Sequence, residues 1–207
     1  SITFLNKNIL NPKEAAIMRT KVGYMAQGLG LILTPNLSVA ENIDYFADMY
    51  QVPQDERKRM KDDLFERLYL HPFNERLAKN LSGGMKQKLA LSCALIHKPR
   101  ILILDEPTTG VDAVSRTEFW EMLAGLKNEG ITIIVSTPYM DEALRCDRIA
   151  LIQEGKLLGI DTPVSIRNSY GRKLYAVSHP ERYRLLIALR SLPQVVSPEP
   201  FGDSVHA

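Results

Sequence analysis

The apolar and polar positions of the chain alternate with two periods, one typical of strands and one of helices. The aliphatic run at 131–135 is rich in β-branched residues, as in strands that are buried on both faces. Together with two further apolar runs, it predicts strands at 22–27, 101–104 and 131–135. Apolar positions three and four apart predict helices at 12–20, 38–50 (opened by a Ser-x-x-Glu capping box), 54–70, 84–97, 114–129 and 139–145. Strands alternating with helices in this order predict an α/β fold with a parallel sheet covered on both faces.

The two ends of the chain follow different patterns. Residues 1–9 alternate like a strand, with Asn6-Lys7-Asn8 as a turn. From Thr162 the pattern changes, because Thr162-Pro163 is typical of an N-cap followed by proline at the first helical position. Beyond it we expect a strand at 173–177, a helix at 180–192, a strand at 194–197 and one more within 201–206. The α/β part is therefore followed by a small α+β extension.

Composition narrows the classes of function. The net charge is +2, and no basic run is interleaved with aromatic residues, so we expect no nucleic-acid partner. The two cysteines, Cys93 and Cys146, lie in helical patterns without metal-ligand spacing, which indicates reduced thiols. No apolar stretch is long enough to span a bilayer, and no signal peptide opens these residues. If the protein works at a membrane, other chains or segments must anchor it.

The most informative stretch is 81–112, LSGGMKQKLALSCALIHKPRILILDEPTTGVD. A Ser-Gly-Gly turn at 82–84 opens a helix, and the unpaired N–H groups of a helix N-terminus attract phosphate. Glycines let that backbone approach an anion closely. An aliphatic strand then runs directly into Asp105 and Glu106. One carboxylate at such a strand end can hold Mg²⁺, and its neighbour can orient or activate a water that attacks a phosphoryl group.

Each motif alone has a purely structural explanation, which is a core strand with an N-capped helix beside it. An isolated Asp-Glu pair favours that explanation, but the two motifs together, at this separation, favour a nucleotide site. Residues 81–87, LSGGMKQ, resemble the signature motif of ATP-binding cassette (ABC) ATPases. Residues 101–112, ILILDEPTTGVD, resemble the Walker B strand and D-loop of the same family.

The resemblance implies a P-loop NTPase-like ABC ATPase core, a parallel sheet with flanking helices, with an inserted helical subdomain and a small α+β C-terminal extension. That extension is similar to the one on exporter-type subunits. The implied segments are 1–35 (the end of the N-terminal core part through the Q-loop), 36–98 (helical subdomain with the signature helix), 99–161 (Walker B, D-loop and switch-loop half of the core) and 162–207 (C-terminal extension).

The resemblance also implies roles for single residues. Gln27 falls where the Q-loop glutamine belongs and would touch Mg²⁺ or the attacking water. Asp105 would hold Mg²⁺, and Glu106 would be the catalytic general base or water-orienting residue. In a head-to-tail pair of cassettes the signature serves the partner's ATP, and Asp112 contacts the partner. The implied nucleotide-binding residues are Gln27, Ser82, Gly83, Gly84, Gln87, Asp105 and Asp112, the metal residues are Asp105 and Gln27, and the cofactors are ATP and Mg²⁺.

Two features depart from the family pattern. No G-x-x-x-x-G-K-[ST] phosphate loop (Walker A) occurs in these residues, and the nearest match, GYMAQGLG at 23–30, ends in Leu29-Gly30 instead of Lys and Ser or Thr. In the switch loop, Pro138 stands where the family has a histidine, and proline offers neither a side-chain donor nor an N–H. We therefore expect the 207-residue chain alone to bind ATP poorly and to show no ATPase activity.

The resemblance implies two partners, a second ABC cassette and transmembrane permease domains, and with them a peripheral position at the cytoplasmic face of the inner or plasma membrane. Family members dock membrane helices on the inserted helices, where Tyr45, Phe46, Met49 and Tyr50 can line a groove. The leading hypothesis is the ATP-binding subunit or domain of an ABC exporter. The alternatives are a non-hydrolysing regulatory cassette that completes a partner's site, which the proline favours, and a soluble ABC protein of translation or DNA repair.

Overall fold

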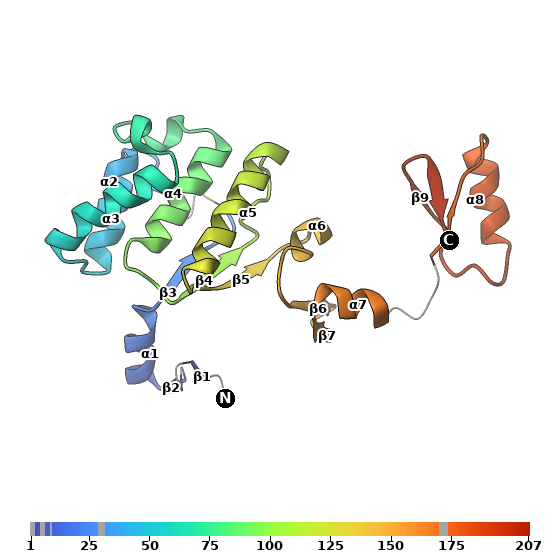
Figure 1. The fold of residues 1–207 in the computed structure, drawn as a ribbon, viewed down its shortest axis with the longest axis horizontal. Helices are drawn as coiled ribbons and strands as arrows, with labels where there is room; N and C mark the ends of the chain where they lie inside the picture. Colours follow the sequence, from blue (N-terminus) through green and yellow to red (C-terminus); the bar gives the residue numbers. More distant parts are fainter. Residues whose placement is uncertain (1–2, 5–6, 9, 29–31, 170–173) are drawn as a thin grey trace. The chain divides into compact units, whose positions relative to one another are not determined.

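The computed structural model describes residues 3–4, 7–8, 10–28, 32–169 and 174–207 (Figure 1). The chain divides into two compact units, Ser1–Met140 and Asp141–Ala207. Among the helices in the described ranges, none is both long and apolar enough to cross a bilayer. The four-segment division implied by the family resemblance stays a prediction.

The first unit is built on a parallel sheet of three strands, with β4 in the centre. The strands are β3 (Val22–Met25), β4 (Ile101–Asp105) and β5 (Thr132–Ser136). The register places Asp105, the last residue of β4, opposite Ser136, the last residue of β5. Because the strands are parallel, their carboxyl ends lie at one edge of the sheet. The predicted α/β fold with a parallel sheet is thus confirmed.

Strand β5 differs from its expected environment. Its residues alternate between exposed and half-exposed, whereas the β-branched run at 131–135 predicted a buried strand. The prediction was wrong because β5 is last in the strand order, and within the described residues only β4 pairs with it. The central strand β4, with a neighbour on each side, buries Leu102 and Leu104 fully.

Helix α4 (Gly83–Leu95) packs closely on β3. A Cβ added to Gly23 of β3 would lie 2.5 Å from the carbonyl oxygen of Ala94, so only glycine permits this approach. Helix α5 (Ala113–Asn128) contacts both α4 and β5. The largest fully buried apolar side chains of this unit are Met25, Ile43, Leu70, Leu89, Leu91, Ile96, Leu102, Leu104 and Phe119.

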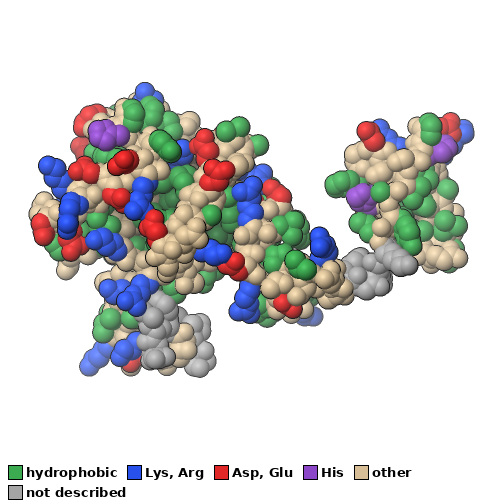
Figure 2. Space-filling model, in the orientation of Figure 1, with side chains coloured by type: hydrophobic (Ala, Val, Ile, Leu, Met, Phe, Trp, Pro, Cys, Tyr) green, Lys and Arg blue, Asp and Glu red, His purple; other side chains and the backbone are tan. Residues whose placement is uncertain are grey.

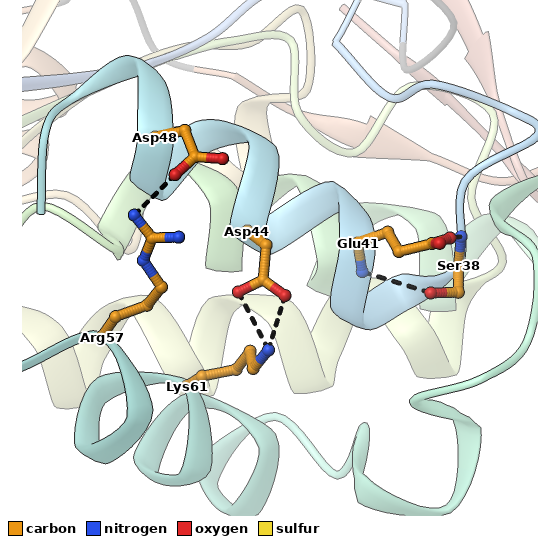
Figure 3. A network of polar contacts seen from close by, with 6 residues as sticks. All are labelled: Ser38, Glu41, Asp44, Asp48, Arg57 and Lys61. Atoms are coloured by element: carbon orange, nitrogen blue, oxygen red, sulfur yellow. Dashed lines mark hydrogen bonds and ion pairs between the residues drawn. The ribbon is translucent and has the colours of Figure 1, made fainter. Parts of the chain in front are cut away.

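In the described residues two α-helices lie between β3 and α4, as expected of an inserted helical subdomain: α2 (Val39–Met49) and α3 (Gln54–Arg67). The predicted capping box opens α2 (Figure 3). Ser38 Oγ accepts a hydrogen bond from the Glu41 N–H at 3.2 Å, and Glu41 Oε2 accepts one from the Ser38 N–H at 2.7 Å. The short 3₁₀ helices η2 (His71–Phe73) and η3 (Ala78–Asn80) then lead to α4.

Ion pairs join α2 to α3. Lys61 lies 2.7 Å from Asp44, and Arg57 lies 2.7 Å from Asp48 (Figure 3). Acidic and basic side chains are interspersed over this part of the surface (Figure 2), which is typical of a solvated helix face. Helix α3 ends before the predicted residue 70, because Tyr69 takes a left-handed main-chain conformation with φ of 55°.

A hairpin of β1 (Thr3–Phe4) and β2 (Lys7–Asn8) and the helix α1 (Pro12–Arg19) come before β3. The prediction of a turn at Lys7 and Asn8 was wrong, because both residues pair with β1 as a strand. Asn6, the third residue of that predicted turn, lies outside the described residues.

The second unit consists of short strands and helices. Its elements are β6 (Ile149–Gln153), β7 (Lys156–Asp161), α7 (Pro163–Ser169), β8 (Ala176–Val177), α8 (Arg182–Arg190), β9 (Glu199–Phe201) and β10 (Ser204–His206), while α6 (Met140–Ala143) lies at the boundary. Strands β6 and β7 form an antiparallel hairpin, and β8, β10 and β9 form an antiparallel sheet in that order. The α+β character of the extension is therefore as expected.

Two details of this unit differ from expectation. Residues 194–197, predicted as a strand, contain a turn in which the Val195 N–H donates to the Leu192 carbonyl oxygen at 3.0 Å. The prolines at 193 and 198, which lack an N–H for strand pairing, flank this segment. Strand β8 is shorter than the predicted run at 173–177, of which Lys173 lies outside the described residues.

Candidate nucleotide site

The carboxyl edge of the parallel sheet brings together residues that are far apart in the sequence. Gln27 follows β3, Asp105 ends β4, Glu106 comes directly after it, and Ser136 ends β5. Such an edge is where open α/β folds bind their ligands. Of the residues implied by the family resemblance, Gln27, Asp105 and Glu106 meet here.

The main chain of Glu106 leaves the strand in an unusual direction. Its φ is 43°, in the left-handed region that residues other than glycine rarely adopt. In this conformation the Glu106 N–H donates to the Ser136 carbonyl oxygen at 3.1 Å and to Ser136 Oγ at 3.0 Å. The contact with β5 thus fixes the residue that carries the candidate catalytic carboxylate.

The carboxylate of Glu106 is held by two side-chain donors. Gln27 Nε2 donates to Glu106 Oε2 at 2.9 Å, and Thr109 Oγ1 donates to the same oxygen at 3.0 Å. One donor comes from the end of β3 and the other from the turn that follows Glu106. Two hydrogen bonds on one oxygen set the rotamer of the side chain and therefore the direction of its other oxygen.

Asp105 is joined to Glu106 through one hydroxyl group. Ser136 Oγ donates to Asp105 Oδ1 at 2.6 Å while it accepts from the Glu106 N–H. The spacing of the two neighbouring carboxylates is therefore fixed by β5. The role of Ser136 was missed from the sequence, and its only signal was its place at the end of the strand aligned with β4. Thr109 was also missed, although it lies three residues after Glu106 in a turn.

The two glycines that open α4 have different environments. Ser82 is the N-cap, and its Oγ accepts from the Met85 N–H at 3.3 Å. A Cβ added to Gly83 would meet no heavy atom within 4 Å, so this position is open. A Cβ added to Gly84 would lie 2.6 Å from Ser115 Oγ at the start of α5. Gly84 therefore permits close packing of two helices, whereas Gly83 leaves room in front of the helix N-terminus.

Gln87 does not face an open surface. Its side chain is 1% exposed, and its Nε2 donates to the carbonyl oxygen of Pro107. Within the described part of the chain its Oε1 is buried without a hydrogen-bond partner. The nucleotide contact expected of Gln87 therefore finds no support in this geometry, because the amide is turned into the protein.

Asp112 is the N-cap of α5. Its Oδ1 accepts from the Ser115 N–H at 2.9 Å. This main-chain hydrogen bond lowers the pKa of the Asp112 carboxyl below its ordinary value. The carboxylate is therefore ionised at neutral pH. A contact with a partner cassette, as the family resemblance implies, stays a prediction.

The switch loop after β5 carries no histidine. Pro138 lies between Thr137 and Tyr139, and the Tyr139 N–H donates to Thr137 Oγ1 at 3.1 Å. The guanidinium of Arg116 on α5 lies 4.3 Å from the centre of the Tyr139 ring, which fixes the loop on that helix. Pro138 itself has no hydrogen to donate to a phosphate.

Each of the four histidines is used elsewhere. His97 stacks on Tyr50 at 3.7 Å between ring centres, and burial lowers the pKa of His97. His71 contacts Phe65, in the helical part of the first unit. In the second unit, His179 accepts from the Glu181 N–H and His206 stacks on Phe201.

The strand-end residues fit a magnesium ion. The described residues hold no cluster of three metal-binding side chains, but Mg²⁺ does not need one. It keeps several waters and binds through one or two carboxylates together with the phosphates of its substrate. Asp105 offers such a carboxylate, and Gln27, whose Nε2 donates to Glu106, keeps its amide oxygen as a second ligand atom.

Comparison with known proteins identifies the family. The family model described as "ABC transporter" matches residues 1–109. The probable multidrug ABC transporter ATP-binding protein YbhF of Escherichia coli (strain K12) is 40% identical over 196 residues, which are 94% of this chain and 34% of YbhF. The linearmycin resistance ATP-binding protein LnrL of Bacillus subtilis (strain 168) is 33% identical over 188 residues, which are 88% of this chain and 59% of LnrL.

The fold of the chain is similar to that of a solved ABC transporter protein. CbiO1 of Clostridium perfringens, described as part of the ABC transporter complex cbiONQ, matches with a TM-score of 0.73 and 29% identity. The match covers 80% of this chain and 67% of cbiO1.

The chain belongs to the ABC transporter family. This confirms the hypothesis drawn from the motifs at 81–112, and the alternative of a translation or DNA-repair protein is not favoured. The chain spans less than two thirds of the length of both bacterial relatives.

Proposed function

We propose that this chain, as part of an assembled transporter, couples ATP binding and hydrolysis to transmembrane export through the dimerisation of two cassettes. The observation that carries the proposal is the Glu106 carboxylate, held by Gln27 and Thr109 beside Asp105 at the carboxyl edge of the sheet. A hydrogen-bonded carboxylate next to a magnesium-binding carboxylate is what phosphoryl transfer to water requires. The names of YbhF and LnrL, both described as ATP-binding proteins, support the same activity.

In this mechanism Glu106 orients the water that attacks the terminal phosphate of ATP and accepts a proton from it. Gln27 and Thr109 hold Glu106 Oε2, so the carboxylate keeps one direction toward that water. Asp105 is fixed by Ser136 as the ligand of Mg²⁺. When bound, Mg²⁺ neutralises the charge that develops on the phosphate oxygens.

The N-terminus of α4 serves the ATP that the partner cassette holds. Ser82 caps the helix, and the open space at Gly83 lets a phosphate approach the main-chain N–H groups. Gly84 packs on Ser115, so this helix end is held against the start of α5. Dimerisation is then part of the mechanism, because one chain supplies its signature to the ATP of the other.

Pro138 lowers the rate of hydrolysis at this site. A histidine there would donate a hydrogen bond to the terminal phosphate, and proline supplies none. This one observation favours the regulatory alternative, a cassette that completes a partner's site with little turnover of its own. The complete hydrogen-bond network at Glu106 favours hydrolysis, and we therefore keep hydrolysis as the proposed activity.

The proposed partners are a second cassette and the permease domains of an exporter. CbiO1 is described as part of an ABC transporter complex, and YbhF as a multidrug transporter protein. We place the chain at the cytoplasmic face of the inner or plasma membrane, held there by its permease partners. The exposed Tyr45 and Met49 on α2 are the proposed contact with them.

The test is the steady-state ATPase rate of the native full-length protein with its permease. We expect Glu106→Gln to lower kcat at least about a hundredfold, because the amide cannot accept the proton from water. The control is Glu121→Gln, an exposed carboxylate on α5, which should keep the wild-type rate. If Glu106→Gln keeps the wild-type rate, the proposed role of Glu106 is wrong.

A further inference from the structure

The amide of Gln87 connects the signature helix to the turn that holds Glu106. Gln87 lies on α4, one helical turn after the signature glycines, and its Nε2 donates to the carbonyl oxygen of Pro107. Pro107 is the residue that follows Glu106. This hydrogen bond therefore joins the two motifs that, in the proposed function, act on two different ATP molecules.

The turn that contains Pro107 is held to Glu106 by two hydrogen bonds. The Thr109 N–H donates to the Glu106 carbonyl oxygen at 3.3 Å, and Thr109 Oγ1 donates to Glu106 Oε2 at 3.0 Å. Thr108, between Pro107 and Thr109, is 1% exposed, so the turn is packed rather than free. A shift of the Pro107 carbonyl therefore moves Thr109, and with it the donor that holds the Glu106 carboxylate.

The side of α4 that carries Gln87 is fixed to the start of α5 by two further contacts. Gly84 packs against Ser115, and Lys88 Nζ lies 2.9 Å from Glu118 Oε2. These contacts join two helices, and Gln87 on the same face reaches the turn itself. A change in the position of the signature end of α4 therefore reaches Glu106 through Gln87.

A purely structural role explains the burial of Gln87 less well. Its Oε1 is buried without a partner in the described part of the chain, and a buried unpaired oxygen destabilises the fold. Methionine has nearly the same length and packs without that oxygen, so packing alone does not require an amide here. The function of the amide lies in the hydrogen bond from its Nε2.

We propose that Gln87 is a positioning residue that sets the Glu106 carboxylate through the Pro107–Thr109 turn. Through it, occupation of the signature by the partner's ATP is communicated to the site of this chain. The proposal rests on the proposed function, because it assumes that Glu106 acts in hydrolysis and that the signature faces an ATP. It assigns Gln87 to the coupling of two sites instead of to direct contact with nucleotide.

The test compares Gln87→Met with Ser92→Ala in the native full-length protein. Met removes the donor to Pro107 at similar volume, while Ser92 is a buried polar residue of the same helix whose Oγ donates to the Lys88 carbonyl oxygen within that helix. The first measurement is hydrogen exchange of the main-chain amides at 105–112 without nucleotide. The second is kcat and KM for ATP.

We expect Gln87→Met to speed exchange at 105–112 roughly tenfold, since the Pro107 carbonyl loses its donor, and Ser92→Ala to leave it unchanged. We expect kcat to fall about tenfold with KM for ATP nearly constant, because the carboxylate is displaced while the phosphate contacts remain. Unchanged exchange at 105–112, or an equal fall in kcat for Ser92→Ala, overturns the proposal.

The exchange measurement keeps this proposal separate from the proposed function. If the wild-type protein does not hydrolyse ATP, the proposed function fails on that result alone. The rate of amide exchange at 105–112 in Gln87→Met still shows whether the hydrogen bond from α4 stabilises the turn.

Discussion

Glu106 combines an unfavourable main-chain conformation with many hydrogen bonds. A left-handed φ costs an L-residue about 1–2 kcal/mol. Two hydrogen bonds from the Glu106 N–H to Ser136, and two at the carboxylate from Gln27 and Thr109, offset that cost. Local strain held by the surrounding contacts is a common property of preorganised sites. The conformation of Glu106 is therefore fixed by the protein before any substrate binds.

Substitution of Pro138 tests whether the switch position limits the rate of ATP hydrolysis. We expect Pro138→His to raise the ATPase rate of the native full-length protein about tenfold, because a histidine adds a donor for the charge that develops on the terminal phosphate. The exposed Pro200, in β9 of the second unit, gives the control variant Pro200→His. A rate that does not change in Pro138→His would show that the switch position does not limit hydrolysis.

Single residues could be predicted where a motif fixes their place. Gln27, Asp105 and Glu106 lie at strand ends that the sequence pattern located, and the structure brings them together. Ser136 and Thr109 could not be predicted in the same way. Ser136 meets Asp105 across 31 positions of sequence, because β5 is the strand that pairs with β4. A hydroxyl group carries no motif of its own, so its role depends on a pairing that only the folded sheet reveals.

At the scale of the elements, α4 is the helix on which the core of the first unit depends. It buries residues on nearly all sides, from Leu89 and Leu91 to Ile96 just after its end. One of its faces packs on β3, where Gly23 permits close approach, and another packs on α5 through Gly84. The signature end of this helix is therefore held in place by the core.

The two helices α4 and α5 offer a matched pair of glycine substitutions. We expect Gly84→Ala to destabilise the fold by about 1–3 kcal/mol, because its methyl group would lie 2.6 Å from Ser115 Oγ. We expect Gly125→Ala to stabilise it by about 0.5–1 kcal/mol, because alanine favours a helix and a Cβ there meets no atom within 4 Å. Gly125 lies in α5 and lines a hollow against Leu64 of α3.

Unfolding by denaturant measures both substitutions. The only tryptophan, Trp120, lies buried on α5, so its fluorescence reports the packing of that helix. If both substitutions change the free energy of unfolding in the same direction, the packing of α4 and α5 described above is wrong.

Elements could be predicted where their signals are local. The capping box of Ser38 and Glu41 uses four neighbouring residues, and it forms as predicted. The exposure of β5 could not be predicted, because it depends on strand order and not on the β-branched residues of the strand. The turn within 194–197 shows the same limit, since among the described residues no strand pairs with its valines.

At the scale of the whole molecule, the proposed function gives one chain parts of two nucleotide sites. The edge of the sheet with Asp105 and Glu106 belongs to the proposed site of this chain. The N-terminus of α4, with Ser82 and Gly83, belongs to the proposed site of its partner. If two chains pair as proposed, hydrolysis at each site should depend on both chains, because one core holds both parts. The contact between the proposed sites is the turn after Glu106, reached by Gln87.

The most direct test of this account is the ATPase rate of Gly83→Asp in the native full-length protein. An aspartate at this position meets no atom of the chain within 4 Å of its Cβ, and an acid in the first turn of a helix is favourable, so the fold should keep its stability. Its carboxylate would repel a phosphate that approaches the helix N-terminus. We predict that Gly83→Asp unfolds at the wild-type denaturant concentration but loses ATP turnover, while Gly125→Ala keeps it. Wild-type turnover in Gly83→Asp would show that the signature does not face a nucleotide, and would contradict the account.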